Sequence, residues 1–191
     1  LFHFVDWETG KRMWNSEASS IDTVICLAGM RAARQYWKDR EITGLVDRFG
    51  KRMDWEWMRT QGGTKTTEGL VSMGFIPEKG HIDGRWGDTY DECKMLYVLG
   101  YGLSDMPTHG WRLIKRQPLT YEGIEFLTGG PLFLHQMSES FYDFRGKRDG
   151  LGYSYEVATR NAALAQQAYT ANNPGKYAAY SRDFFGLSAC D

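Results

Sequence analysis

Two glutamates, Glu17 and Glu92, each stand beside the expected start of an apolar helical run, where a carboxylate can do acid–base chemistry. Such a group can protonate a glycosidic oxygen or activate water, and glycoside hydrolysis uses two carboxylates. The alternative is structural, because a helix N-terminus favours a nearby acidic side chain whatever its role. That preference also favours the ionised form of Glu92. A proton-donor role there needs a raised pKa, which desolvation by Trp86 or Tyr90, or a second carboxylate nearby, would supply.

Helix-capping patterns accompany both glutamates. The run Ser19-Ser20-Ile21-Asp22 matches the Ser/Thr-x-x-acid signature and predicts that Asp22 folds back on the Ser19 backbone N–H. The run Thr89-x-x-Glu92 matches the same signature. We therefore interpret Asp22 first as a capping residue, and the capping role of Glu92 remains an alternative to catalysis.

A second group of polar residues lies between residues 135 and 145. His135 and Gln136 have the chemistry to hydrogen-bond sugar hydroxyls, although a histidine in an apolar helix is more often a satisfied core residue. For Asp143 and Arg145 we expect a structural ion pair or contacts with loop backbone. The sequence has no HExxH, phosphate-binding glycine loop or GxSxG motif, so it predicts neither a metal nor any other cofactor.

The elements that must position these residues are mostly helical. Residues 19–37 and 88–102 are apolar on several faces and predict buried helices, whereas 41–59 have the 3.6-residue spacing of an amphipathic outer helix. Further helices are predicted at 132–144, 154–171 and 175–184, with a hairpin or irregular insertion at 62–87 and a long loop at 104–131. This alternation fits a toroid of inner and outer helices or an ordinary helical bundle, and periodicity does not separate them.

Composition narrows the classes of function. The 191 residues carry 23 Lys and Arg against 24 Asp and Glu, so there is no electrostatic case for nucleic acid or an anionic membrane. No apolar run is long enough to span a membrane. The aromatic fraction of 15% suits sugar faces as well as an ordinary core. The three cysteines give no disulfide framework, and Cys26 and Cys93 are expected as buried thiols.

Taken together, these segments resemble the bacterial glucoamylase-like domain, the group that includes the endo-β-1,2-glucanases of glycoside hydrolase family 144. Any one match is weak, but their order and number along nearly the whole chain are specific. The main matching segments are Ser16-Glu17-x-Ser19-Ser20-Ile21-Asp22-Thr23, Asp54-Trp55-x-Trp57-Met58, Arg85-Trp86 with Tyr90-Asp91-Glu92, Gly130-Pro131-Leu132-Phe133-x-His135-Gln136-x-Ser138 and Asp143-Phe144-Arg145.

The resemblance implies an (α/α)6 toroid that hydrolyses β-1,2-glucan to sophoro-oligosaccharides, with Glu17 and Glu92 as the catalytic pair. It implies an oligo- or polysaccharide substrate, no cofactor, and a periplasmic or secreted location. Substrate contacts are then expected from aromatic platforms and from hydroxyl-binding polar groups. These candidates are Trp7, Trp14, Asp22, Trp86, Tyr90, Trp111, His135, Gln136 and Arg145.

Several features differ from the family pattern. Asp91 stands where an asparagine is usual, Met137 where a tyrosine is usual, and Ala158 where an asparagine is usual, which puts linkage specificity in question. A full toroid of twelve helices needs roughly 240 residues. We therefore expect residues 1–191 to be one catalytic domain that lacks flanking helices. Two other functions stay open: a transglycosylase module of a cyclic β-1,2-glucan synthase, and a non-catalytic carbohydrate-binding domain.

Overall fold

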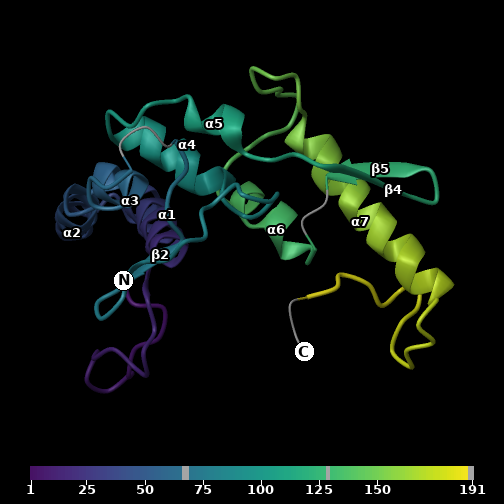
Figure 1. Cartoon of the computed structure of the whole chain (residues 1–191), viewed down its shortest axis with the longest axis horizontal. Helices are drawn as coiled ribbons and strands as arrows, with labels where there is room; N and C mark the ends of the chain where they lie inside the picture. Colours follow the sequence, from purple (N-terminus) through teal and green to yellow (C-terminus); the bar gives the residue numbers. More distant parts are fainter. Residues whose placement is uncertain (66–68, 128–129, 189–191) are drawn as a thin grey trace. The chain divides into compact units, whose positions relative to one another are not determined.

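A computed structural model describes residues 1–65, 69–127 and 130–188 (Figure 1). Helices dominate these ranges, and two small antiparallel sheets accompany them. The hairpin within 62–87, which is part of the first sheet, was predicted, whereas the second sheet was not. The helices are α1 Ser20–Trp37, α2 Arg40–Lys51, α3 Trp55–Thr60, α4 Lys94–Leu103, α5 Gly110–Leu113, α6 Phe133–Gln136, the 3-10 turn η1 Ser138–Ser140 and α7 Tyr155–Asn172. The strands are β1 Ala18–Ser19, β2 Gly74–Ile76, β3 Gly80–His81, β4 Pro118–Tyr121 and β5 Ile124–Leu127.

The described chain divides into two compact units. Unit 1 comprises Leu1–Asp88 and Cys93–Ile114, and unit 2 comprises Thr89–Glu92 and Lys115–Asp191. The single catalytic domain over residues 1–191 stays a prediction. No helix in the described ranges is both long enough and apolar enough to cross a membrane.

Helix α1 is the centre of unit 1 and contacts both α2 and α4. Its buried side chains, Ile21, Val24, Leu27 and Ala28, occupy more than one face, as expected for an inner helix. Helix α4 is buried over most of its surface, which confirms the second predicted buried helix. Helix α2 buries only Val46, so it is the amphipathic outer helix that its spacing predicts.

Local signals placed some helix starts correctly and others wrongly. Helix α1 begins after Ser19, whose Oγ accepts a hydrogen bond from the Asp22 backbone N–H at 3.2 Å. The predicted helix 41–59 is interrupted, because Asp54 caps a new helix by accepting a hydrogen bond from the Trp57 backbone N–H. The capping prediction at 89–92 is wrong: α4 begins only at Lys94, and its N-cap residue is Cys93, whose side chain makes no cap hydrogen bond.

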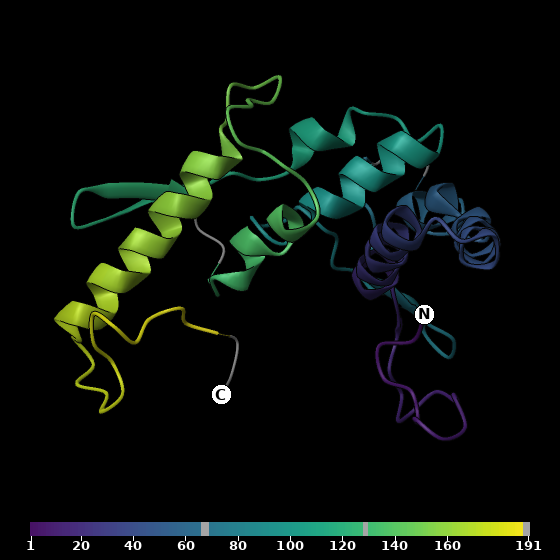
Figure 2. The ribbon, with the colours of Figure 1, turned by 180° about the vertical axis from the view of Figure 1, so that it is seen from behind.

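Unit 2 is built on α7, which lies beside the β4–β5 hairpin in both views of the ribbon (Figure 2). This hairpin and α5 occupy the segment 104–131, which we expected to be a long loop. The predicted helix 132–144 is shorter and forms α6 and η1. The predicted helix 175–184 is wrong: that segment contains turns, and its end returns to α6 through a hydrogen bond from the Leu132 N–H to the Leu187 carbonyl.

The cysteines only partly match the expectation. Cys93 is buried, whereas Cys26 is half-buried, with its thiol 3.9 Å from the sulfur of Met30. Cys190, the third cysteine, lies outside the described residues.

Candidate active site

Glu17 immediately precedes β1, the short strand that leads into α1. An antiparallel bridge joins Phe2 to Ala18, and the same register places His3 directly opposite Glu17. The backbone N–H of His3 donates to the Glu17 carbonyl at 2.8 Å. Because directly opposed residues share a face of a sheet, the imidazole and the carboxylate lie side by side.

The two side chains are joined by a short hydrogen bond. His3 Nδ1 lies 2.8 Å from Glu17 Oε1, and His3 Nε2 lies 3.9 Å from Asp22 Oδ2. The imidazole therefore stands between two carboxylates that both figure in the predicted site. The capping role predicted for the Asp22 side chain is wrong, because the Ser19 backbone N–H donates instead to the Leu1 carbonyl.

A row of rings extends from this cluster toward solvent. The His3 ring stacks on Phe4, with centroids 4.4 Å apart and planes 14° apart, and Phe4 meets the edge of Trp14 at 5.2 Å. Trp14 is 73% exposed and has a left-handed backbone with φ of 49°, which bulky residues rarely adopt. Trp7, in the turn before it, is 88% exposed. Two predicted sugar platforms thus lie on the chain segment that carries Glu17.

The other predicted residues of unit 1 have structural partners. The Trp86 indole N–H donates to Ser20 Oγ at 2.8 Å, and Ser20 Oγ donates in turn to the Ser72 carbonyl at 2.7 Å. Trp111 is half-buried and meets Tyr97 edge-on, with centroids 6.4 Å apart. These contacts hold both indoles in place.

Gly74 allows the close approach of strand β2 to Glu17. It pairs with Ser19, and a Cβ atom at this position would lie 2.8 Å from Glu17 Cγ and 2.9 Å from the Ala18 carbonyl oxygen. We expect Gly74→Ala to lower the free energy of unfolding by about 1–3 kcal/mol, because the added methyl overpacks this contact. Urea denaturation followed by tryptophan fluorescence measures the change.

Gly29→Ala is the matched control for this substitution. Gly29 lies inside α1 with nothing within 4 Å of the added Cβ, so alanine there should raise the free energy of unfolding by about 1 kcal/mol. Equal effects of the two alanines would show that the contact with Glu17 does not constrain Gly74.

Glu92 and the remaining predicted residues belong to unit 2. Glu92 is half-buried, and its backbone carbonyl accepts a hydrogen bond from Ser138 Oγ at 3.1 Å. The neighbouring Tyr90 is buried against the buried His135, with ring centroids 5.2 Å apart. Unit 2 therefore gathers Tyr90, Glu92 and His135 around α6, while the Gln136 side chain is exposed.

Arg145 lines a polar cavity of about 350 Å³ in unit 2, together with residues 139–144 and Glu156. Its guanidinium contacts both oxygens of Asp143, at 2.9 and 3.0 Å, which confirms the predicted ion pair. These bonds hold the pKa of the Asp143 carboxyl well below its usual range and raise the pKa of Arg145. Arg145 is strongly exposed, so its remaining N–H groups can reach a ligand in the cavity.

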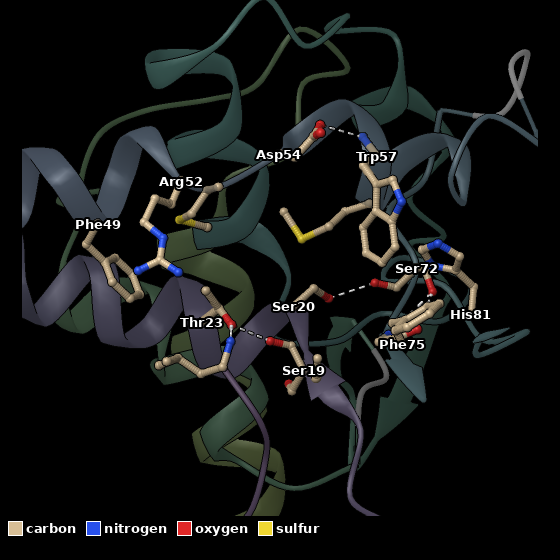
Figure 3. A pocket seen from close by; sticks show the side chains of 15 residues that line it. Ser19, Ser20, Thr23, Phe49, Arg52, Asp54, Trp57, Ser72, Phe75 and His81 are labelled. Carbon is tan, nitrogen blue, oxygen red and sulfur yellow. Dashed lines mark hydrogen bonds between the residues drawn. The ribbon is translucent and has the colours of Figure 1, made fainter. Parts of the chain in front are cut away.

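A second cavity, of about 340 Å³, lies in unit 1 and contains none of the predicted site residues (Figure 3). Trp57, Phe75 and His81 form one wall, with ring centroids 4.3 to 5.1 Å apart, and Phe49 and Arg52 lie across from them. Burial lowers the pKa of His81, whose two ring nitrogens have no hydrogen-bond partner. No local pattern indicated this cluster, because its rings come from three separate elements, α3, β2 and β3.

Successive side chains of a strand point to opposite faces, and this alternation decides how Glu17 is oriented relative to the rings of the cavity. Ala18, Phe75 and His81 are paired across the sheet and share one face, the face of the cavity. Glu17 precedes Ala18 by one residue, so its side chain points to the opposite face, beside His3. The Glu17 side chain therefore points away from the face that carries Phe75 and His81, while Ser19 and Gly74 also line the cavity.

Metal chemistry has no evident site here: within the described ranges, no three His, Cys, Asp or Glu side chains gather closely enough to hold an ion.

Comparison with known proteins gives consistent matches. A family model named Glycoamylase, described as "Putative glucoamylase", matches residues 85–191. A curated relative, the exo beta-1,2-glucooligosaccharide sophorohydrolase (non-reducing end) of Parabacteroides distasonis, is 22% identical over 99% of this chain. That alignment covers 31% of the relative, so the chain spans about a third of its length.

Two solved structures share the fold. One, titled a "putative glucoamylase" from Bacteroides caccae, has a TM-score of 0.72 and 25% identity, and the match covers 97% of this chain and 47% of that one. The beta-1,2-glucanase from P. distasonis has a TM-score of 0.76 and 21% identity, over 100% of this chain and 32% of that one. The fold of residues 1–191 thus recurs as less than half of each larger chain.

Proposed function

This chain belongs to the glycoamylase family, and from that premise we propose that it is part of a glycoside hydrolase that cleaves β-1,2-linked glucan to sophoro-oligosaccharides. The substrate class follows from the relatives in P. distasonis, both named for β-1,2-glucan chemistry. The buried helices α1 and α4 would be two inner helices of an (α/α)6 toroid, and α2 an outer one. A periplasmic or secreted location is proposed from the same resemblance.

The observation that carries the proposal is the setting of Glu17. Its carboxylate is 25% exposed, so a ligand can reach it, and His3 fixes its direction by a 2.8 Å hydrogen bond. Hydrolysis of a glycosidic bond needs a fixed carboxylate of this kind opposite a second one. The exposed Trp14, joined to His3 through Phe4, supplies a ring on which a sugar face can stack.

Glu92 is the proposed second carboxylate. It is half-buried, beside the buried Tyr90, in the short segment that precedes α4. One glutamate would donate a proton to the leaving oxygen, and the other would act as base or nucleophile. Glycosidases that retain the anomeric configuration hold their two carboxyl groups about 5–5.5 Å apart, and inverting ones hold them roughly 6.5–9.5 Å apart.

A linkage panel tests the proposal. The protein is incubated with β-1,2-, β-1,3-, β-1,4- and α-1,4-glucans, and new reducing ends and product lengths are measured. We expect new reducing ends from the β-1,2-glucan alone, with short oligosaccharides as products. Cyclic or lengthened products would instead support the transglycosylase, and calorimetric binding without new reducing ends would support the carbohydrate-binding domain.

A further inference from the structure

We propose that His3 is a positioning residue that holds Glu17 as an oriented, ionised carboxylate, an inference that rests on the proposed function. His3 was not among the residues predicted for the site. The structure places it opposite Glu17 through the register of the Phe2–Ala18 bridge. Its partners are both acidic, with Glu17 at 2.8 Å from Nδ1 and Asp22 at 3.9 Å from Nε2.

The direction of the proton follows from the chemistry of the two groups. A neutral imidazole always carries one ring N–H, whereas an ionised carboxyl group carries no proton at all. An ionised carboxylate only accepts hydrogen bonds, hence Nδ1 must donate. With one of its oxygens held on the Nδ1–H, the geometry suits Glu17 to taking up a proton or attacking rather than to donating.

Four contacts hold His3. Its backbone N–H donates to the Glu17 carbonyl, its ring stacks on Phe4, and its two ring nitrogens face Glu17 and Asp22. Phe4 is supported in turn by Trp14. A ring constrained in this way loses little entropy when it orients a carboxylate, which is how supporting groups contribute to catalysis.

Two substitutions distinguish the contribution of the aromatic ring of His3 from that of its ring N–H. His3→Phe keeps an aromatic ring on Phe4 but removes the donor, whereas His3→Asn removes the ring but can keep an amide N–H near the position of Nδ1. We expect His3→Phe to lower kcat on β-1,2-glucan by about 10- to 100-fold, with KM changed less than about threefold, because a hydrogen bond to a charged group is lost. His3→Asn should recover most of that loss.

A double substitution shows whether His3 acts through Glu17. In a Glu17→Gln background, His3→Phe should cause little further loss of kcat, because coupled residues are not additive. Additive losses would overturn the proposal, and so would equal losses from His3→Phe and His3→Asn.

A spectroscopic measurement keeps the proposal separate from the proposed function. In 15N–1H correlation spectra at about pH 8, where a free imidazole is neutral, we expect the His3 ring to carry its proton on Nδ1. In Glu17→Leu the proton should move to Nε2. If the proton stays on the same ring nitrogen of His3 in Glu17→Leu, the positioning role is overturned, even if the protein cleaves glucan. The expected change would support it even if no glucan is cleaved, in which case only the proposed function fails.

Discussion

Replacing either proposed catalytic carboxylate by its amide, Glu17→Gln or Glu92→Gln, is expected to lower kcat on β-1,2-glucan by about 10²- to 10⁴-fold. The amide keeps the size of the side chain but can neither donate the proton nor carry the charge, and proton transfer by a positioned group contributes about that factor. Initial rates of reducing-end release at saturating glucan measure the change. Because both substitutions remove chemistry rather than ground-state binding, KM should change much less.

Two other glutamates supply matched controls, one in each unit. Glu78, exposed and paired with Arg12 at 2.6 Å, belongs to unit 1, and the exposed Glu125 on β5 belongs to unit 2. Their Gln substitutions should leave kcat within about twofold, because neither is placed to transfer a proton. If Glu17→Gln and Glu92→Gln retain turnover equal to these controls, the carboxylate assignment is wrong.

The largest expected loss of stability in unit 2 comes from Asp149→Ala. Asp149 and Arg116 are 7% and 3% exposed at their side chains and lie 3.5 Å apart, and Asp149 also accepts from the Tyr155 hydroxyl at 2.7 Å. Its other oxygen accepts from the backbone of Leu151 and Tyr153. Removing one partner of a buried ion pair leaves the other charge buried, so we expect a loss of about 3–5 kcal/mol. Urea unfolding and hydrogen exchange of α7 measure it.

Asp143→Ala is the control, because Asp143 is also paired with an arginine but at the surface. An ion pair at the surface contributes little to stability, because solvent screens the attraction between its charges. This substitution should therefore leave the unfolding midpoint nearly unchanged. Burial also raises the pKa of Tyr155, which keeps its hydroxyl protonated as the donor to Asp149. If Asp149→Ala is no more destabilising than Asp143→Ala, the buried pair does not stabilise unit 2.

Helices whose start and end signals are local were predictable from the sequence. Ser19 caps α1 and Ser154 precedes α7, so each helix begins where its capping residue indicates. The same signature failed at Thr89, because α4 begins five residues later, at Lys94, with Cys93 as its N-cap residue. The last predicted helix failed because Asn173 and Lys176 have positive φ, so the chain turns where a helix would have to begin.

The pairing of His3 with Glu17 was out of reach of sequence reasoning. Spacing of 14 residues carries no signal by itself, and the contact arises only once the Phe2–Ala18 register is set. The cluster of Trp57, Phe75 and His81 was missed for the same reason, since its members meet through β2 and β3 pairing. Aromatic exposure was more accessible, because Trp7 and Trp14 lie in a turn-rich segment that cannot bury them.

Side chains alternate between the two faces of the β1–β2–β3 sheet. The number of residues inserted or deleted before β1 therefore decides which side chains face which side. A single-residue insertion between Gly10 and Ser16 that shifted the strand by one position would turn Glu17 toward the ring-lined cavity and aim Ala18 at His3. An insertion of two residues in the turn would restore the original orientation of every side chain. Insertions or deletions of an even number of residues in this turn should therefore be tolerated. A homologue that differs by an odd number would need a bulge elsewhere in the strand to keep the same side chains on each face.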